Sequence, residues 1–217
     1  MLTPTTKTPS GKRQAPRKPS RQRKPARFLR WLIPLLLLVV VAGALVNLGS
    51  RGWFSKLEQV PSWVDVQIID INGSGRRGEQ LEGVRDIVIH YVGNPGTTAQ
   101  QNHDFFNQPE TSVSAHFLVG LDGEVIQCIP LNEKSSASNE RNLDTISIEV
   151  CHPDASGQFN QATYDSLVKL TAWLCDAAGI GREHVIRHYD ITGKLCPLSF
   201  VEHPDTWTQF LEDVKHA

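Results

Sequence analysis

The sequence lacks the signatures of several common protein classes. Its 217 residues contain no internal repeat, which excludes a solenoid or propeller array. No CxxC pair occurs among its four cysteines, so the cysteines form no metal-binding or redox motif of their own. The glycine-rich segment 72–78 is not followed by a helical pattern at the required spacing, so no phosphate-binding fingerprint is present.

Acidic residues are absent from the first thirty positions, which hold ten of the chain's 22 lysine and arginine residues. Proline and serine fill much of the remainder, so we expect residues 1–30 to form a disordered basic arm. The rest of the chain has 12 basic and 23 acidic side chains, a net charge of −11. Such a surface binds nucleic acid poorly, and the sequence therefore predicts no nucleic-acid partner.

Charged residues are also absent from the eighteen positions Trp31–Leu48. A helix of that length reaches about 27 Å, enough to cross a hydrocarbon core. We therefore predict a transmembrane helix over residues 31–49 that anchors the protein in the cell membrane, with the basic arm inside and the following residues outside. The alternative is a secreted protein, because Ala42-Gly43-Ala44 resembles a signal-peptide cleavage site. The long basic arm and the apolar run beyond Ala44 favour the uncleaved anchor.

Residues 50–63 are expected to be a linker, and residues 64–217 are expected to form one domain. An Asp-Gly step between two apolar runs predicts a hairpin of residues 115–120 with 124–129. Other strands are expected at 64–71, 87–91, 145–151 and 185–187, and helices at 100–107, 161–178 and 207–216. This mixture favours an α/β fold with a mixed central sheet flanked by helices.

One strand and one helix are especially well defined. Strict alternation in residues 145–151 puts the aliphatic side chains on one face and Glu149 on the other. In residues 161–178, apolar side chains recur at helical spacing, and Asn160 and Gly179 are suited to cap the start and the end of the helix.

Two histidines and one cysteine form a candidate metal site. His90 closes an apolar run, and seven residues separate His188 from Cys196. Each histidine ends an expected strand, where side chains project over a sheet edge at which ligand sites gather. Three protein ligands leave the fourth position of a tetrahedral zinc ion open, which distinguishes catalytic from structural zinc. The trio therefore indicates a metallohydrolase, whereas each residue taken alone is more typical of a core or loop position.

Two further residues are candidates for the chemistry. Glu149 lies in a strand otherwise suited to burial, and a carboxylate beside a zinc-bound water can take its proton and pass it to a leaving amine. Lys194 lies two residues before Cys196, and its ammonium can stabilise an oxyanion at the metal. The alternatives are a solvent-facing strand carboxylate and a solvated loop lysine.

The remaining cysteines carry no evident chemistry. If Cys196 binds metal, three cysteines remain, and three cannot all pair with one another. We interpret Cys128, Cys151 and Cys175 as small buried apolar residues. A Cys128–Cys151 disulfide is the alternative.

Four ordered blocks make the chain similar to a known family. They are Ile87-Val88-Ile89-His90, the run from Ser114 to Gln127, Thr145-Ile146-Ser147-Ile148-Glu149-Val150-Cys151, and the run from Val185 to Pro197. Through these blocks, residues 86–200 resemble the type 2, zinc-dependent N-acetylmuramoyl-L-alanine amidases, a group shared by phage endolysins, bacterial autolysins and peptidoglycan recognition proteins. Four blocks in order are far more specific than any one of them.

The resemblance implies a mixed sheet flanked by helices and a peptidoglycan substrate. It implies zinc bound by His90, His188 and Cys196. It also implies Glu149 as the catalytic carboxylate and Lys194 as its helper in hydrolysing the amide between the muramoyl lactyl group and L-alanine. A non-catalytic peptidoglycan-binding module on the same fold is the alternative, but such modules typically lose the cysteine ligand. A membrane-tethered scaffold or cell-division factor leaves the trio unexplained.

Two departures from the family pattern concern the substrate groove. Many relatives have a tyrosine where Ala115 stands, so we expect that His116 supplies a polar group there or that this role is absent. Many relatives also carry an aromatic-His-Ala-Gly segment where this chain has residues 134–141. The groove is therefore expected to differ from that of typical relatives.

Overall fold

The computed structural model describes residues 34, 36–41, 59–71 and 73–217. The chain divides into two compact units, residues 1–44 and 45–217. The basic arm, most of the expected transmembrane helix and most of the expected linker lie outside the described residues. Within the part of the chain that the structure describes, no helix has both the length and the apolar character needed to cross a membrane.

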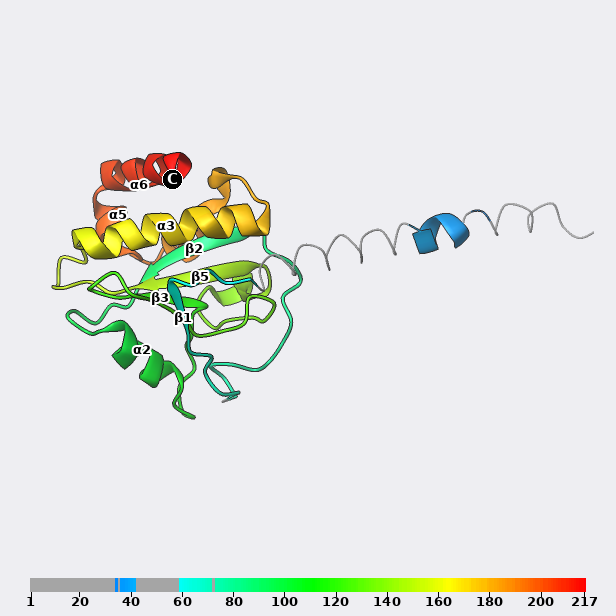
Figure 1. Ribbon diagram of the computed structural model, residues 1–217, viewed down its shortest axis with the longest axis horizontal. Helices are drawn as coiled ribbons and strands as arrows, with labels where there is room; N and C mark the ends of the chain where they lie inside the picture. Colours follow the sequence, from blue (N-terminus) through cyan, green and yellow to red (C-terminus); the bar gives the residue numbers. More distant parts are fainter. Residues whose placement is uncertain (1–33, 35, 42–58, 72) are drawn as a thin grey trace, which may run out of the picture. The chain divides into compact units, whose positions relative to one another are not determined.

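The second unit is built on a six-stranded mixed sheet (Figure 1). In the order in which they lie side by side, the strands are β1 (Val64–Val66), β4 (Val125–Gln127), β3 (Phe117–Val119), β5 (Thr145–Val150), β2 (Asp86–Tyr91) and β6 (Val185–Arg187). Strands β3, β5, β2 and β6 run parallel, whereas β4 is antiparallel to β3 and parallel to β1. The carboxyl ends of the four parallel strands therefore meet at one edge, where ligand sites of α/β folds gather.

Helices cover both faces of the sheet. They are α2 (Ala99–Phe106), α3 (Gln161–Ala178), α4 (His188–Thr192), α5 (Leu198–Glu202) and α6 (Pro204–His216), with the short 3-10 helices η1 (Asn139–Leu143) and η2 (Arg182–His184). Figure 1 shows α3, α5 and α6 on one face and α2 on the opposite face. The prediction of an α/β fold with a mixed sheet flanked by helices is confirmed for residues 64–217.

The alternation along β5 separates two cores. Ile146, Ile148 and Val150 belong to the larger apolar cluster, which also contains the buried side of α3. On the other face, Cys151 belongs to a smaller cluster together with Ala99 of α2. All four cysteines of the chain are buried and free, so they behave as apolar residues and no disulfide joins any of them.

Helix α3 has the predicted bounds. Oδ1 of Asn160 accepts a hydrogen bond from Thr163 N at 3.0 Å, and Gly179 ends the helix with a left-handed φ of 65°. The hairpin turn that packs against its start requires Gly123, which has a φ of +81°. A Cβ at that position would approach the Ala162 carbonyl oxygen to 2.8 Å, so only glycine fits there.

The first strand is shorter than predicted. β1 ends at Val66, although Gln67 N and Ile69 N still donate to the carbonyl oxygens of Gln127 and Cys128 at 3.0 Å. Ile69 is buried, but its aliphatic neighbours are exposed. β1 lies at the edge of the sheet. Because the residues after Val66 are not buried at alternate positions, the regular pattern of hydrogen bonds to β4 ends after three residues.

Candidate metal centre

His90 and Glu149 lie side by side near the carboxyl ends of their strands. The parallel register of β2 and β5 pairs His90 with Glu149, so both side chains project from the same face of the sheet. Oε1 of Glu149 is 4.0 Å from Nδ1 of His90. Because β2 and β5 are neighbouring strands, their pairing alone places the two side chains next to each other.

His188 and Cys196 reach the same edge from the segment after β6. His188 begins α4 directly after β6. Gly193 ends α4 with a φ of 76°, a left-handed conformation that glycine adopts without strain. The chain then turns back, and Tyr189 N donates to Cys196 O at 2.9 Å. This closed turn brings Cys196 back beside His188.

The three predicted ligands converge. His90, His188 and Cys196 each offer one ligand atom, and these atoms all lie within 4.8 Å of one another. Sγ of Cys196 is 3.9 Å from Nδ1 of His90, and the two imidazole rings have centroids 4.6 Å apart. All three side chains are buried.

Burial makes charge unfavourable on these donors. The pKa of His90 lies well below its usual value, mainly because of burial and then because of His188 and Lys194. Burial also raises the pKa of the Cys196 thiol to about 12, and Glu149 adds to this shift. A divalent cation would supply the positive charge that a buried thiolate requires. Two imidazoles and one thiolate are donors typical of zinc, so the residues fit a zinc ion.

Glu149 presents an unpartnered oxygen beside this cluster. Its Oε2 atom is buried and has no hydrogen-bond partner among the described residues. Burial raises the pKa of Glu149 to about 8, and Lys194 opposes the shift. A buried carboxyl oxygen without a partner is unfavourable, and such groups commonly serve a ligand or a reaction. Glu149 is therefore placed to exchange a proton with a small molecule at the cluster.

Lys194 lies within electrostatic reach of the whole cluster. Its side chain is exposed and it stands two residues before Cys196. Its positive charge lowers the pKa of each of four groups, namely His90, Glu149, His188 and Cys196. The ammonium group therefore supplies positive potential to the site while its solvation is retained.

The structure does not bring His116 to this site. The side chain is completely buried and both of its ring nitrogens are occupied. Nδ1 lies 3.1 Å from Ser147 Oγ and 3.0 Å from Ser147 N, and Nε2 lies 2.9 Å from Glu133 O. His116 thus joins β5 to the loop that follows β4, and it lines no exposed groove.

The sequence does not predict two residues that lie beside the candidate metal ligands. Ser138 Oγ lies 3.2 Å from Nε2 of His90, and Asn139 Oδ1 lies 3.2 Å from Nε2 of His188. Both residues fall in the segment that departs from the family pattern. That departure was the one sequence signal that pointed to them.

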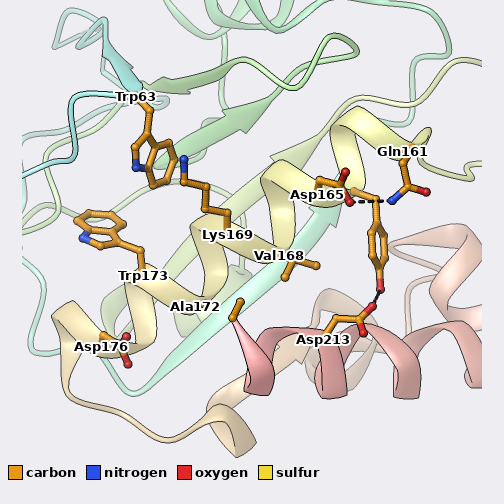
Figure 2. Close-up of a pocket in the computed structure, with 11 residues that line it drawn as sticks. Trp63, Gln161, Asp165, Val168, Lys169, Ala172, Trp173, Asp176 and Asp213 are labelled. Atoms are coloured by element: carbon orange, nitrogen blue, oxygen red, sulfur yellow. Dashed lines mark hydrogen bonds between the residues drawn. The ribbon is translucent and has the colours of Figure 1, made fainter.

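A separate groove lies over α3 and α6, as Figure 2 shows. It has a volume of about 550 Å³ and contains none of the cluster residues. Two pairs of its polar groups are hydrogen-bonded: Tyr164 donates to Asp213 at 2.6 Å and Gln161 donates to Asp165 at 2.7 Å. The groove therefore offers no unpartnered buried group like Glu149 Oε2.

Residues 80–199 match the family model described as N-acetylmuramoyl-L-alanine amidase. This match covers more than half of the chain. The chain belongs to this amidase family. The family resemblance that the four sequence blocks indicated is thereby confirmed, and the amidase domain contains every residue of the metal cluster.

Individual relatives agree with the family assignment. The chain is 30% identical over 163 residues to N-acetylmuramoyl-L-alanine amidase CwlL of Bacillus licheniformis, a match that covers 67% of this chain and 45% of CwlL. It is 31% identical over 168 residues to N-acetylmuramoyl-L-alanine amidase BlyA of Bacillus subtilis, covering 68% of this chain and 45% of BlyA. The chain thus spans less than half the length of these curated relatives.

The fold also matches solved amidase structures. The catalytic domain of XlyA superposes with a TM-score of 0.61 at 27% identity, covering 70% of this chain and 98% of that domain. The match therefore covers nearly all of the solved XlyA domain, whereas the matches to CwlL and BlyA cover less than half of each protein.

Proposed function

We propose that this protein is a zinc-dependent peptidoglycan hydrolase that cleaves the amide between the lactyl group of N-acetylmuramic acid and L-alanine of the stem peptide. The family membership and the names of the relatives support this activity. The single observation that carries it is the buried, unpartnered Oε2 of Glu149 beside three convergent metal ligands.

His90, His188 and Cys196 are the residues that would hold zinc. Zinc, when bound, supplies Lewis acidity toward a carbonyl oxygen and lowers the pKa of water. Three protein ligands leave room for one exchangeable ligand, which suits catalysis better than a closed structural site. The burial of all three side chains keeps bulk solvent from competing with them.

Glu149 moves the proton. Its Oε2 accepts a proton from the attacking water while the water oxygen bonds to the lactyl carbonyl carbon. The same carboxyl then donates that proton to the nitrogen of L-alanine as the carbon–nitrogen bond breaks. The products are a lactyl carboxylic acid and a free amine, and transfer of the remaining acid proton to the amine gives the carboxylate and the ammonium ion. Burial raises the pKa of Glu149 above its usual range, which strengthens the carboxylate as a base and allows the same group to return the proton as an acid.

Lys194 stabilises the charge that develops on the carbonyl oxygen. Lys194 lowers the pKa values of His90, Glu149, His188 and Cys196, which supports a place for its ammonium group near the reacting carbonyl. A preorganised cation near a developing oxyanion lowers the barrier because little reorganisation is required during the reaction.

The first experiment measures bound metal and reaction products on the same purified protein. Metal analysis should find about one zinc per chain. Mass spectrometry of digested peptidoglycan should find stem peptides with a new L-alanine amino terminus and glycan that retains its lactyl carboxylate. Zinc with wall binding but without these products would support the alternative, a non-catalytic peptidoglycan-binding module.

The proposed location is the outer face of the cell membrane, with residues 31–49 as the anchor. The charge-free run and the basic arm before it support this topology. Protease added to intact protoplasts should remove residues 64–217 and spare the arm. A mature amino terminus at Leu45 would instead establish cleavage after Ala44 and secretion.

A further inference from the structure

We propose that Ser138 and Asn139 are positioning residues of the metal centre, which hold the outer nitrogens of the two histidine rings so that both rings present Nδ1 to the metal. This inference rests on the proposed zinc site at His90, His188 and Cys196. It adds two residues, outside the ligand set, that would govern how strongly that site binds.

The contacts of the two histidines carry this inference. Nδ1 of His90 faces Sγ of Cys196 at 3.9 Å and Oε1 of Glu149 at 4.0 Å, so Nδ1 is the inner nitrogen of that ring. Its Nε2 points the other way and lies 3.2 Å from Oγ of Ser138, whose side chain is completely buried. One nitrogen of His90 thus meets the cluster and the other meets the loop.

Asn139 contacts one ring nitrogen of His188. Its Oδ1 lies 3.2 Å from Nε2 of His188. An amide oxygen only accepts hydrogen bonds, so this contact places the proton on Nε2 and leaves the lone pair of Nδ1 available for a metal. Hydrogen bonds from ligating histidines to such outer partners fix the ring orientation and the tautomer.

The backbone of the loop is shaped to present these two neighbouring side chains. Oδ1 of Asn142 accepts hydrogen bonds from Ala137 N at 3.0 Å and from Ser138 N at 2.6 Å, which fixes the turn. Asn139 has a φ of 54° and is the only residue other than glycine with a positive φ among the described residues. Asparagine tolerates this left-handed conformation better than most residues, and strain of this kind gathers at functional sites.

The same loop is fastened to the sheet away from the metal ligands. Ser135 Oγ lies 2.8 Å from Ser147 Oγ, and Nε2 of His116 lies 2.9 Å from Glu133 O. Ser136 N donates to Ser114 Oγ at 3.0 Å. The loop is therefore held to the sheet independently of His90 and His188.

The experiment compares zinc affinity among full-length variants by competition with a chromophoric chelator. Ser138→Ala and Asn139→Gly each remove one outer partner, and glycine keeps the left-handed φ of position 139. Each variant should bind zinc about 10–100-fold more weakly than the wild type. Asn139→Asp keeps an accepting oxygen and should restore most of the affinity that Asn139→Gly loses.

Ser136→Ala is the matched control in the same loop as Ser138 and Asn139, because the Ser136 hydroxyl donates to Ser74 O and touches neither histidine. It should bind zinc as the wild type does. With cobalt in place of zinc, the visible absorption bands should shift in Ser138→Ala and Asn139→Gly but not in Ser136→Ala, since these bands report the geometry of the ligands. Thermal unfolding of the metal-free proteins identifies any variant that fails to fold, and the contrast between Asn139→Asp and Asn139→Gly then decides the question.

Equal zinc affinity and equal cobalt spectra in all folded variants would overturn the positioning role while leaving the proposed hydrolase intact. A wild-type protein that binds no zinc would overturn both proposals together. These two failures are distinguishable because the wild-type measurement comes first.

Discussion

The two faces of β5 show how one strand serves two purposes. On the side of α3, Ile146, Ile148 and Val150 are fully buried in the larger apolar cluster. On the other side, Ser147 is bonded to His116, and Glu149 keeps one buried oxygen without a partner. Every aliphatic side chain on the first face packs against other apolar residues of the protein, whereas Glu149 Oε2 on the second face has no partner until a ligand binds there. This difference separates the part of the domain that provides stability from the part that provides chemistry.

The largest effect should follow from removing a ligand on the polar side. Cys196→Ser should weaken zinc binding by more than the roughly 10–100-fold that is typical of a lost outer partner, because a thiolate leaves a three-ligand site. Cys175→Ser is the matched control, since Cys175 is buried in the apolar cluster. It should lower stability but keep zinc affinity. Full zinc occupancy in Cys196→Ser would remove Cys196 from the site.

The next effect concerns turnover alone. Glu149→Gln should keep zinc and the fold, because the amide has nearly the same shape, but it should lose the proton transfer. General acid–base catalysis is worth roughly 10²–10⁴ in rate, or about 3–5 kcal/mol of barrier. Initial rates of wall digestion measure this loss. Asp165→Asn, an exposed change in the groove of Figure 2, should leave the rate unchanged. Near wild-type digestion by Glu149→Gln would make Glu149 only a strand carboxylate.

A substitution on the apolar side should lower the stability of the domain and leave zinc affinity unchanged. Leu170 of α3 is completely buried in the larger cluster. Leu170→Ala should lower the free energy of unfolding by about 2–5 kcal/mol, because it removes apolar contacts and leaves a cavity. Urea unfolding monitored by circular dichroism measures the loss, and Val66→Ala, at an exposed edge position, should change stability by less than about 0.5 kcal/mol. Zinc affinity of the folded Leu170→Ala protein should remain that of the wild type; a loss would show that the two sides are coupled.

The sequence predicts the apolar side well because helix caps and strand alternation are patterns of residues close together in the chain. Helix α3 has the predicted bounds since Asn160 and Gly179 mark its ends, and alternation alone sorts the side chains of β5. The polar side depends on residues far apart: His90 and Cys196 lie 106 positions from each other. No local pattern brings them together, and the expectation that they meet depends on both histidines ending strands and on the four family blocks.

The misses on the polar side have the same origin. His116 is predicted to replace the polar group of a tyrosine that many relatives have at the position of Ala115, but its ring is instead held by Ser147 Oγ and by two backbone groups, Ser147 N and Glu133 O. Ser138 and Asn139 contact the histidines from a loop in which position 139 adopts a left-handed φ, and periodicity does not reveal such a loop conformation. Loop conformation and strand register are tertiary properties, and sequence patterns predict them poorly.

The smallest effect tests the cap of α3, at the end of the apolar side. Oδ1 of Asn160 accepts from Thr163 N at 3.0 Å, and its Nδ2 donates to Leu121 O at 2.8 Å. Asn160→Ala leaves Thr163 N without this acceptor, and a lost cap of this kind costs about 1 kcal/mol. In a domain of this size, that change lowers the melting temperature by roughly 2–4 °C.

Gln161→Ala is the control for this cap. Gln161 is exposed, and its amide only donates to Asp165, so its loss should change stability by less than about 0.5 kcal/mol. Differential scanning calorimetry of the two variants measures the difference. Digestion rate at saturating zinc should be unchanged in Asn160→Ala, because no atom of the cap touches the metal cluster. A slower rate at full zinc occupancy would mean that the hairpin held by Asn160 transmits strain through β3 to Glu149, and the separation of the two faces would then be incomplete.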